Sequence, residues 1–123
     1  MNNMLVKKIT ETEMKKQRAY SKYAEEAALL LGQQIKLGRK KRKWSEQNLA
    51  DRAGISRATL QKIEAGGMSP SIGLVFEVAA LVGITLFEQD NRSLATRLDL
   101  TQSKIALLPK RIRKQKKAVD DDF

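Results

Sequence analysis

The chain has 123 residues, enough for one domain with extensions but too few for two full hydrophobic cores. It carries 24 basic and 14 acidic side chains, so its formal charge of +10 at pH 7 favours a polyanionic partner over a merely soluble basic protein. Cysteine and histidine are both absent. Disulfides and the usual zinc ligand sets are therefore excluded, and the commonest general base is missing.

The first 22 residues are polar and charged, without the apolar run of a signal peptide. No segment of the chain approaches the roughly 20 apolar residues that a membrane span needs. The sequence therefore predicts a soluble, cytoplasmic protein without a membrane partner. Residues 1–22 are expected to form a partly ordered basic arm.

Residues 23–92 have the composition and spacing of an all-α domain. A first helix is predicted over 23–41, with a buried stripe at steps of three and four residues: Ala27, Ala28, Leu31, Gln34, Ile35 and Gly38. Ser45 is a typical N-cap for a second helix over 46–53, and Gly54 supplies the positive φ that ends it. Ser56 caps a third helix over 57–65, and Pro70 precedes a fourth that ends at Gly83.

The second and third predicted helices are short and joined by a three-residue turn, the pattern of a helix-turn-helix. Its apolar positions would anchor both helices to the domain: Leu49, Ala50, Ala53, Ile55, Leu60 and Ile63. The predicted base-reading residues of the third helix face outward or along the groove wall: Arg57, Ala58, Thr59, Gln61 and Lys62. Arg57 can pair with guanine and Ala58 suits a thymine methyl group, whereas Gln61 and Lys62 fit either a base edge or a phosphate.

Five consecutive basic residues, 39–43, end the first predicted helix. They would meet the negative end of the helix dipole even without a ligand, but their lysines also lie beside the predicted reading unit. We expect a steep salt dependence of binding if they contact the duplex backbone. The predicted phosphate contacts are Lys40, Lys41, Lys43, Ser45, Gln47 and Ser56.

Residues 24–83 resemble the Xre/Cro/CI family of helix-turn-helix domains, which are five-helix DNA-binding modules. The resemblance rests on residues that fall in register with the family: Leu49-Ala50, Gly54-Ile55-Ser56, Leu60 and Ile63-Glu64. It implies an ion pair between Arg39 and Glu64, which assigns Arg39 to structure. The family often begins the second helix with a glutamine that grips a phosphate. This chain has Glu46 there, so Gln47 is the substitute candidate.

A C-terminal helix is predicted over 93–108. Its apolar seam recurs at alternating steps of four and three residues: Leu94, Leu98, Thr101, Ile105 and Leu108. The seam could close onto its own domain, but modules of this size usually read two half-sites about 34 Å apart, which favours a second copy. The predicted homodimer contacts are Leu94, Leu98, Ile105 and Leu108.

Pro109 ends this helix, and residues 109–123 are predicted to form a flexible charged tail, first basic and then acidic. One interpretation is a solubilising end. The other is a tether whose basic part meets DNA or an acidic surface. In that case the final residues dock into a protein partner: Asp120, Asp121, Asp122 and Phe123.

The arrangement of the whole chain resembles the HipB-like antitoxins, which accompany HipA-like kinase toxins. The resemblance implies a homodimer that represses its own operon on double-stranded DNA and binds the kinase. The alternatives are a stand-alone Xre-type regulator and a protein-binding adaptor. No phosphate loop, metal-ligand cluster or pair of nucleophile and base can be assembled from the sequence, so we expect no enzyme, no cofactor and no metal.

Overall fold

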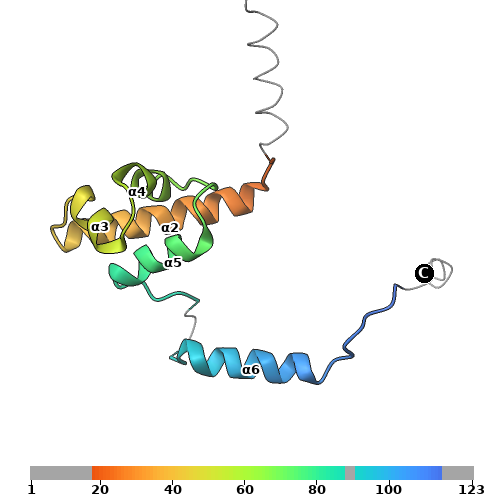
Figure 1. The fold of residues 1–123 in the computed structure, drawn as a ribbon. Helices are drawn as coiled ribbons and strands as arrows, with labels where there is room; N and C mark the ends of the chain where they lie inside the picture. The colour runs from red at the N-terminus through yellow and green to blue at the C-terminus, as the bar shows by residue number, and fades with distance from the viewer. Residues whose placement is uncertain (1–17, 88–90, 115–123) are drawn as a thin grey trace, which may run out of the picture. The chain divides into compact units, whose positions relative to one another are not determined.

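The computed structural model describes residues 18–87 and 91–114. Within these ranges all regular structure is helical, as the predicted all-α class requires. The helices are α2 (Lys22–Lys41), α3 (Glu46–Ala53), α4 (Arg57–Glu64), α5 (Ile72–Leu81) and α6 (Leu94–Ala106) (Figure 1). The chain divides into an N-terminal unit that ends at Thr85 and a C-terminal unit that begins at Leu86. The division falls seven residues before the predicted boundary at 92.

Every one of these helices begins after a serine whose hydroxyl oxygen accepts a hydrogen bond from the amide three residues further on. The capping serines are Ser21, Ser45, Ser56, Ser71 and Ser93. Each cap satisfies one of the four amides that have no partner in the first turn, which stabilises a helix by about 1 kcal/mol. The caps at α3 and α4 are the two that the sequence predicts.

Two glycines with positive φ end helices where the sequence predicts them. Gly54 follows α3 with φ 68°, and its amide donates to the carbonyl groups of Ala50 and Asp51. Gly83 follows α5 with φ 80°. Residues that carry a side chain rarely adopt this left-handed backbone conformation, so a glycine at this position lets the chain leave the helix at little cost in free energy.

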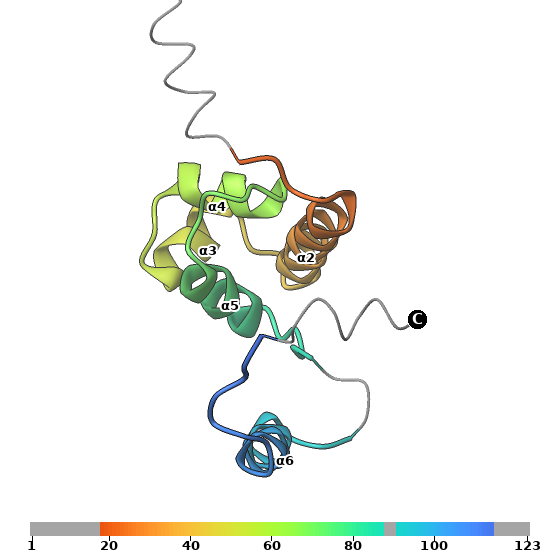
Figure 2. The same cartoon turned by 90° about the vertical axis from the view of Figure 1, so that its right-hand side faces the viewer.

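The four helices of the N-terminal unit surround one small core. α4 packs against both α2 and α3, and α5 packs against the same two helices from the opposite side. Figure 2, in which α2 is seen close to end-on, shows this arrangement. The buried apolar side chains are Ile35, Leu49, Ala50, Leu60, Ile63, Val78, Ala79 and Val82. Each large one contributes about 1.5–3 kcal/mol by leaving water.

Part of the predicted buried stripe of the first helix lies outside this core. Ala27 and Gln34 are exposed, whereas Ile35 is fully buried. Successive residues of a helix are rotated by about 100°, so Gln34 lies well away from the face that α4 and α5 cover. The periodicity alone does not say how wide that covered face is.

The helix of the C-terminal unit ends earlier than predicted. α6 stops at Ala106, and the amides of Leu107 and Leu108 donate to carbonyls three residues back rather than four. This tighter last turn is expected before Pro109, because a proline disfavours the helical conformation of the residue that precedes it.

Of the helices in the described ranges, none has the length and apolar content needed to cross a membrane.

Candidate nucleic-acid interface

Buried side chains fix α4 on the N-terminal unit. Leu49 and Ala50 of α3 and Leu60 and Ile63 of α4 are at most 3% exposed. The amide of Ile55 donates to the carbonyl of Ala50 over 3.0 Å and closes the turn between the two helices. α4 therefore presents its outer face from a supported position, as a helix that enters a DNA groove must.

Most of the predicted base-reading residues lie on the surface of α4. The exposed ones are Arg57, Ala58, Gln61 and Lys62. Thr59 is half-buried, and its hydroxyl group is hydrogen-bonded to the hydroxyl of Ser56 over 2.9 Å. Thr59 thus takes part in the cap of α4, while the other four side chains are accessible to a ligand.

Two of these exposed side chains share one carboxylate. Arg57 donates from Nε to Glu46 Oε1 over 3.0 Å, and its Nη2 lies 3.0 Å from the same oxygen. Gln61 donates from Nε2 to this oxygen over 3.2 Å. The hydrogen bonds from Gln61 and Arg57 hold the pKa of the Glu46 carboxyl below its ordinary value. Glu46 is thus a charged acceptor between the first turn of α3 and the outer face of α4.

The predicted partners Arg39 and Glu64 meet in a buried ion pair. Arg39 Nε lies 2.8 Å from Glu64 Oε2, its Nη2 donates to Oε1 over 3.1 Å, and both residues are 6% exposed. The third guanidinium nitrogen of Arg39, Nη1, donates to the backbone carbonyl of Trp44 over 3.0 Å. The hydrogen bonds with Glu64 raise the pKa of Arg39 above its ordinary value. The pair joins α2, the following turn and the end of α4.

The basic block 39–43 divides by residue type. Arg42, like Arg39, is tied to the fold, because its Nη1 donates to the carbonyl of Val82 at the end of α5 over 2.5 Å. Lys40, Lys41 and Lys43 are exposed. The three predicted phosphate-binding lysines are therefore on the surface, at the C-terminal end of α2 and in the turn that follows.

The other predicted phosphate contacts are polar groups near the first turns of α3 and α4. The hydroxyl oxygens of Ser45 and Ser56 accept backbone amides, and the Ser56 hydroxyl is also hydrogen-bonded to the hydroxyl of Thr59. The hydroxyl hydrogen of Ser45 is left to donate elsewhere. Gln47 is exposed and donates to Asp51 over 2.8 Å. All three side chains are on the surface, and Gln47 has an acidic neighbour that the sequence analysis did not anticipate.

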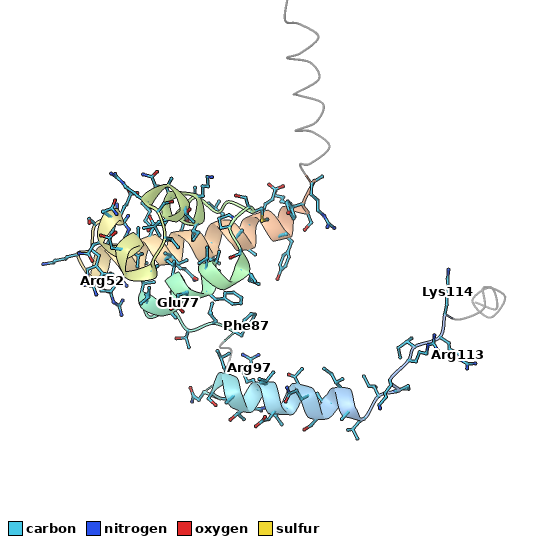
Figure 3. All side chains as sticks on the ribbon, viewed as in Figure 1. Arg52, Glu77, Phe87, Arg97, Arg113 and Lys114 are labelled. Atoms are coloured by element: carbon cyan, nitrogen blue, oxygen red, sulfur yellow. The ribbon has the colours of Figure 1, made fainter. Side chains whose placement is uncertain are left out.

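Arg52 stacks on an aromatic ring, a contact that the sequence did not predict. The guanidinium of Arg52, labelled in Figure 3, lies 4.1 Å from the centre of the Trp44 ring, and its Nε donates to Asn48 over 2.7 Å. Stacking of this kind holds a cation at the surface in one place. A lone tryptophan beside a basic run is the signal that could have drawn attention to it. Arg52 joins the exposed cations near the candidate interface.

The predicted dimer residues lie on α6 and just beyond it, and none is buried within the chain. Their exposed fractions are 52% for Leu94, 57% for Leu98, 62% for Ile105 and 63% for Leu108. Residues 109–114 are exposed and not helical. The four residues predicted to dock a protein partner, 120–123, lie outside the described residues.

Residues 35–89 match a family model described as helix-turn-helix. The matched range begins within α2 and includes α3, α4 and α5. A comparison with curated proteins finds no match. The family match places a helix-turn-helix in the same part of the chain as the anchored α4 and its exposed polar side chains, and it supports a DNA-binding regulator.

Proposed function

We propose that this chain, through its Xre-type helix-turn-helix domain, is a sequence-specific transcriptional repressor that binds an inverted-repeat operator as a homodimer. The observation that carries the proposal is the exposed face of α4. Arg57 and Gln61 lie on this face, and the opposite face of the same helix is buried. A helix of this kind fits a major groove about 12 Å wide.

In the proposed complex, different side chains of α4 contact different base pairs of one half-site. Arg57 pairs with the O6 and N7 atoms of a guanine, and Ala58 contacts a thymine methyl group. Gln61 and Lys62 are one turn further along and reach the next base edges or the adjacent phosphates. The half-site would therefore be read over a few base pairs by one short helix.

Exposed lysines supply the part of the binding energy that does not depend on sequence. Lys40, Lys41 and Lys43 lie at the end of α2 and carry no ion pair in the described part of the chain. Each phosphate that they neutralise releases counterions, so the affinity should fall steeply as salt is raised. These contacts place the domain on the duplex without choosing the sequence.

The first test replaces one base-reading and one phosphate-binding residue. Arg57→Ala should abolish the preference for one base pair per half-site, a loss of about 1–3 kcal/mol of discrimination. Lys41→Ala should instead weaken binding to all duplexes alike and lower the slope of log affinity against log salt by about 1 per protomer. Selection from randomised duplexes and titrations at several salt concentrations measure both effects.

The two variants serve as controls for each other. Arg57→Ala also leaves Glu46 without its cation, so a general loss of affinity is expected beside the lost preference. An unchanged base preference in Arg57→Ala would remove this residue from the reading set. If the unmodified protein protects no inverted repeat in a footprinting experiment and binds all duplexes equally, the repressor proposal fails and an adaptor role is favoured.

The dimer is proposed to form through the apolar seam of α6. Ile105→Asp places a charge in the middle of that seam and should shift the protein toward monomer, because a buried unpaired charge is costly. Sedimentation measures the change, and Asp99→Asn, which alters a charge on the same helix outside the seam, is the matched control. A dimer that persists in Ile105→Asp would place the interface elsewhere.

We further propose that the chain acts as the antitoxin and autoregulator of a HipA-like kinase toxin. Support for this role comes from the resemblance of the sequence, with its basic extension and acidic aromatic end, to HipB-like antitoxins. A kinase gene beside the gene of this chain, and a stable complex of the two products, would bear it out. A chain that binds its operator and has no such neighbour would be a stand-alone regulator.

A further inference from the structure

The carboxylate of Glu46 lies where α3 and α4 meet, among the side chains that the proposed function assigns to base reading. Its side chain is 28% exposed, and a single oxygen, Oε1, receives Nε and Nη2 of Arg57 and Nε2 of Gln61 within 3.2 Å. Arg57 and Gln61 are 11 and 15 residues away in the sequence. The contact therefore depends on how the two helices pack.

We propose that Glu46 is a positioning residue that sets the sequence preference of this protein, by orienting Arg57 toward guanine and Gln61 toward adenine and by keeping Arg57 away from phosphates. The inference rests on the proposed function, since it concerns the same reading face. It names the base that each of the two side chains reads.

Arg57 retains the donors that guanine needs. A guanidinium has five N–H donors in a planar fork. Glu46 accepts from the Nε side, through Nε and Nη2, so the end of the fork formed by Nη1 and the outer hydrogen of Nη2 still points away from the carboxylate. These two parallel donors match the O6 and N7 acceptors that guanine presents in the major groove.

Gln61 is oriented because a carboxylate only accepts hydrogen bonds. The amide of glutamine carries an NH₂ group at one end and a carbonyl at the other, and either can face a neighbour that both donates and accepts. Beside Glu46 the NH₂ end must face the carboxylate. One N–H and the carbonyl then remain for a base, and together they match N7 and the N6 amino group of adenine.

The negative charge of Glu46 also acts against wrong sequences. On a random duplex Arg57 could leave its reading position and pair with a phosphate, which would raise affinity without selecting any base. The ion pair with Glu46 neutralises that cation, and the carboxylate itself is repelled by the phosphate backbone. Discrimination between sequences is improved by such repulsion as much as by attraction to the right base.

Glu46→Gln tests the inference with the full chain. Titrations use the duplex that the unmodified protein selects from a random library, a scrambled duplex of the same length, and one fixed salt concentration. We expect affinity for the scrambled duplex to rise about 3- to 10-fold and the ratio of the two affinities to fall about 10-fold. In a renewed selection, the preferences for guanine and adenine at the two positions should both weaken.

Two further variants separate positioning from charge. Glu26→Gln removes one negative charge from the exposed surface of α2 and should leave the affinity ratio unchanged. Glu46→Asp keeps the charge but shortens the side chain, so random-duplex affinity should stay low while the base preferences weaken. Because exposed ion pairs contribute little to stability, thermal unfolding of all three variants should match the unmodified protein.

An unchanged affinity ratio and unchanged base preferences in Glu46→Gln would overturn the inference. Full base preference in Glu46→Asp would also overturn it, because the shorter carboxylate could not hold both partners in the same way. Failure of the proposed function looks different. In that case the unmodified protein itself would not distinguish the selected duplex from the scrambled one.

Discussion

Glu64→Gln is expected to lower the free energy of unfolding by roughly 3 kcal/mol, the lower part of the range for breaking a buried ion pair. The substitution keeps the size of the side chain but leaves the guanidinium of Arg39, 6% exposed, without a counter-charge. Arginine stays protonated at any ordinary pH, so the cost cannot be relieved by loss of a proton. Urea unfolding followed by helix circular dichroism measures the change.

The single tryptophan gives a second, local readout of the same variant. Trp44 lies in the turn after α2, and its carbonyl accepts a hydrogen bond from Arg39. A disturbed Arg39 should therefore alter the fluorescence of Trp44 even before the unit unfolds. The pair of Glu46 with Arg57 is the matched control, because Glu46→Gln breaks an ion pair whose side chains are 28% and 58% exposed rather than buried. A loss of stability no larger than in that control would show that the buried pair is not a structural requirement.

The helices of the N-terminal unit could be predicted closely because their ends are encoded locally. Ser45 and Ser56 cap α3 and α4, and Gly54 and Gly83 follow α3 and α5 with positive φ. Each of these signals needs only a few neighbouring residues to act. The core positions of α3 and α4 were predictable for a related reason, since two short amphipathic helices have few apolar residues to bury.

The partners of polar side chains could not be predicted in the same way. Glu46 meets Arg57 and Gln61 only because α3 and α4 pack at a particular angle, and Arg52 stacks on Trp44 only because of the way the turn before α3 lies against that helix. Periodicity says which face of a helix is apolar but not where its long side chains end. The sequence therefore suggested the reading face, while the carboxylate within it became visible only in the structure.

The basic block shows the same limit within five consecutive residues. Arg39 is buried in an ion pair and Arg42, although exposed, donates to the carbonyl of Val82, whereas Lys40 and Lys41 are exposed and carry no ion pair in the described ranges. Net charge treats the four residues alike. Their roles differ because the guanidinium groups reach acceptors elsewhere in the fold, Arg39 at Glu64 and the carbonyl of Trp44 and Arg42 at the carbonyl of Val82.

Gly32→Ala is expected to destabilise the N-terminal unit by about 1–3 kcal/mol, although alanine favours helices. A Cβ at Gly32 would collide with the carbonyl oxygen of Ile63 and lie 2.8 Å from the carbonyl oxygen of Glu64. Both atoms belong to the backbone of α4, so no side chain can turn aside to make room. The helix itself must move, which shifts the proposed reading face relative to α2.

Gly73→Ala is the matched control, because Gly73 also lies within a helix but a Cβ there would meet no atom within 4 Å beyond its chain neighbours and the adjacent backbone of its own helix. This variant should keep DNA affinity and gain about 0.5 kcal/mol of stability. Gly32→Ala should lose both stability and affinity, as measured by chemical unfolding and by titration with the selected duplex. If Gly32→Ala were as stable as the unmodified protein and bound DNA equally well, α2 and α4 could separate without consequence. The close packing of these helices would then not be what holds the reading face in place.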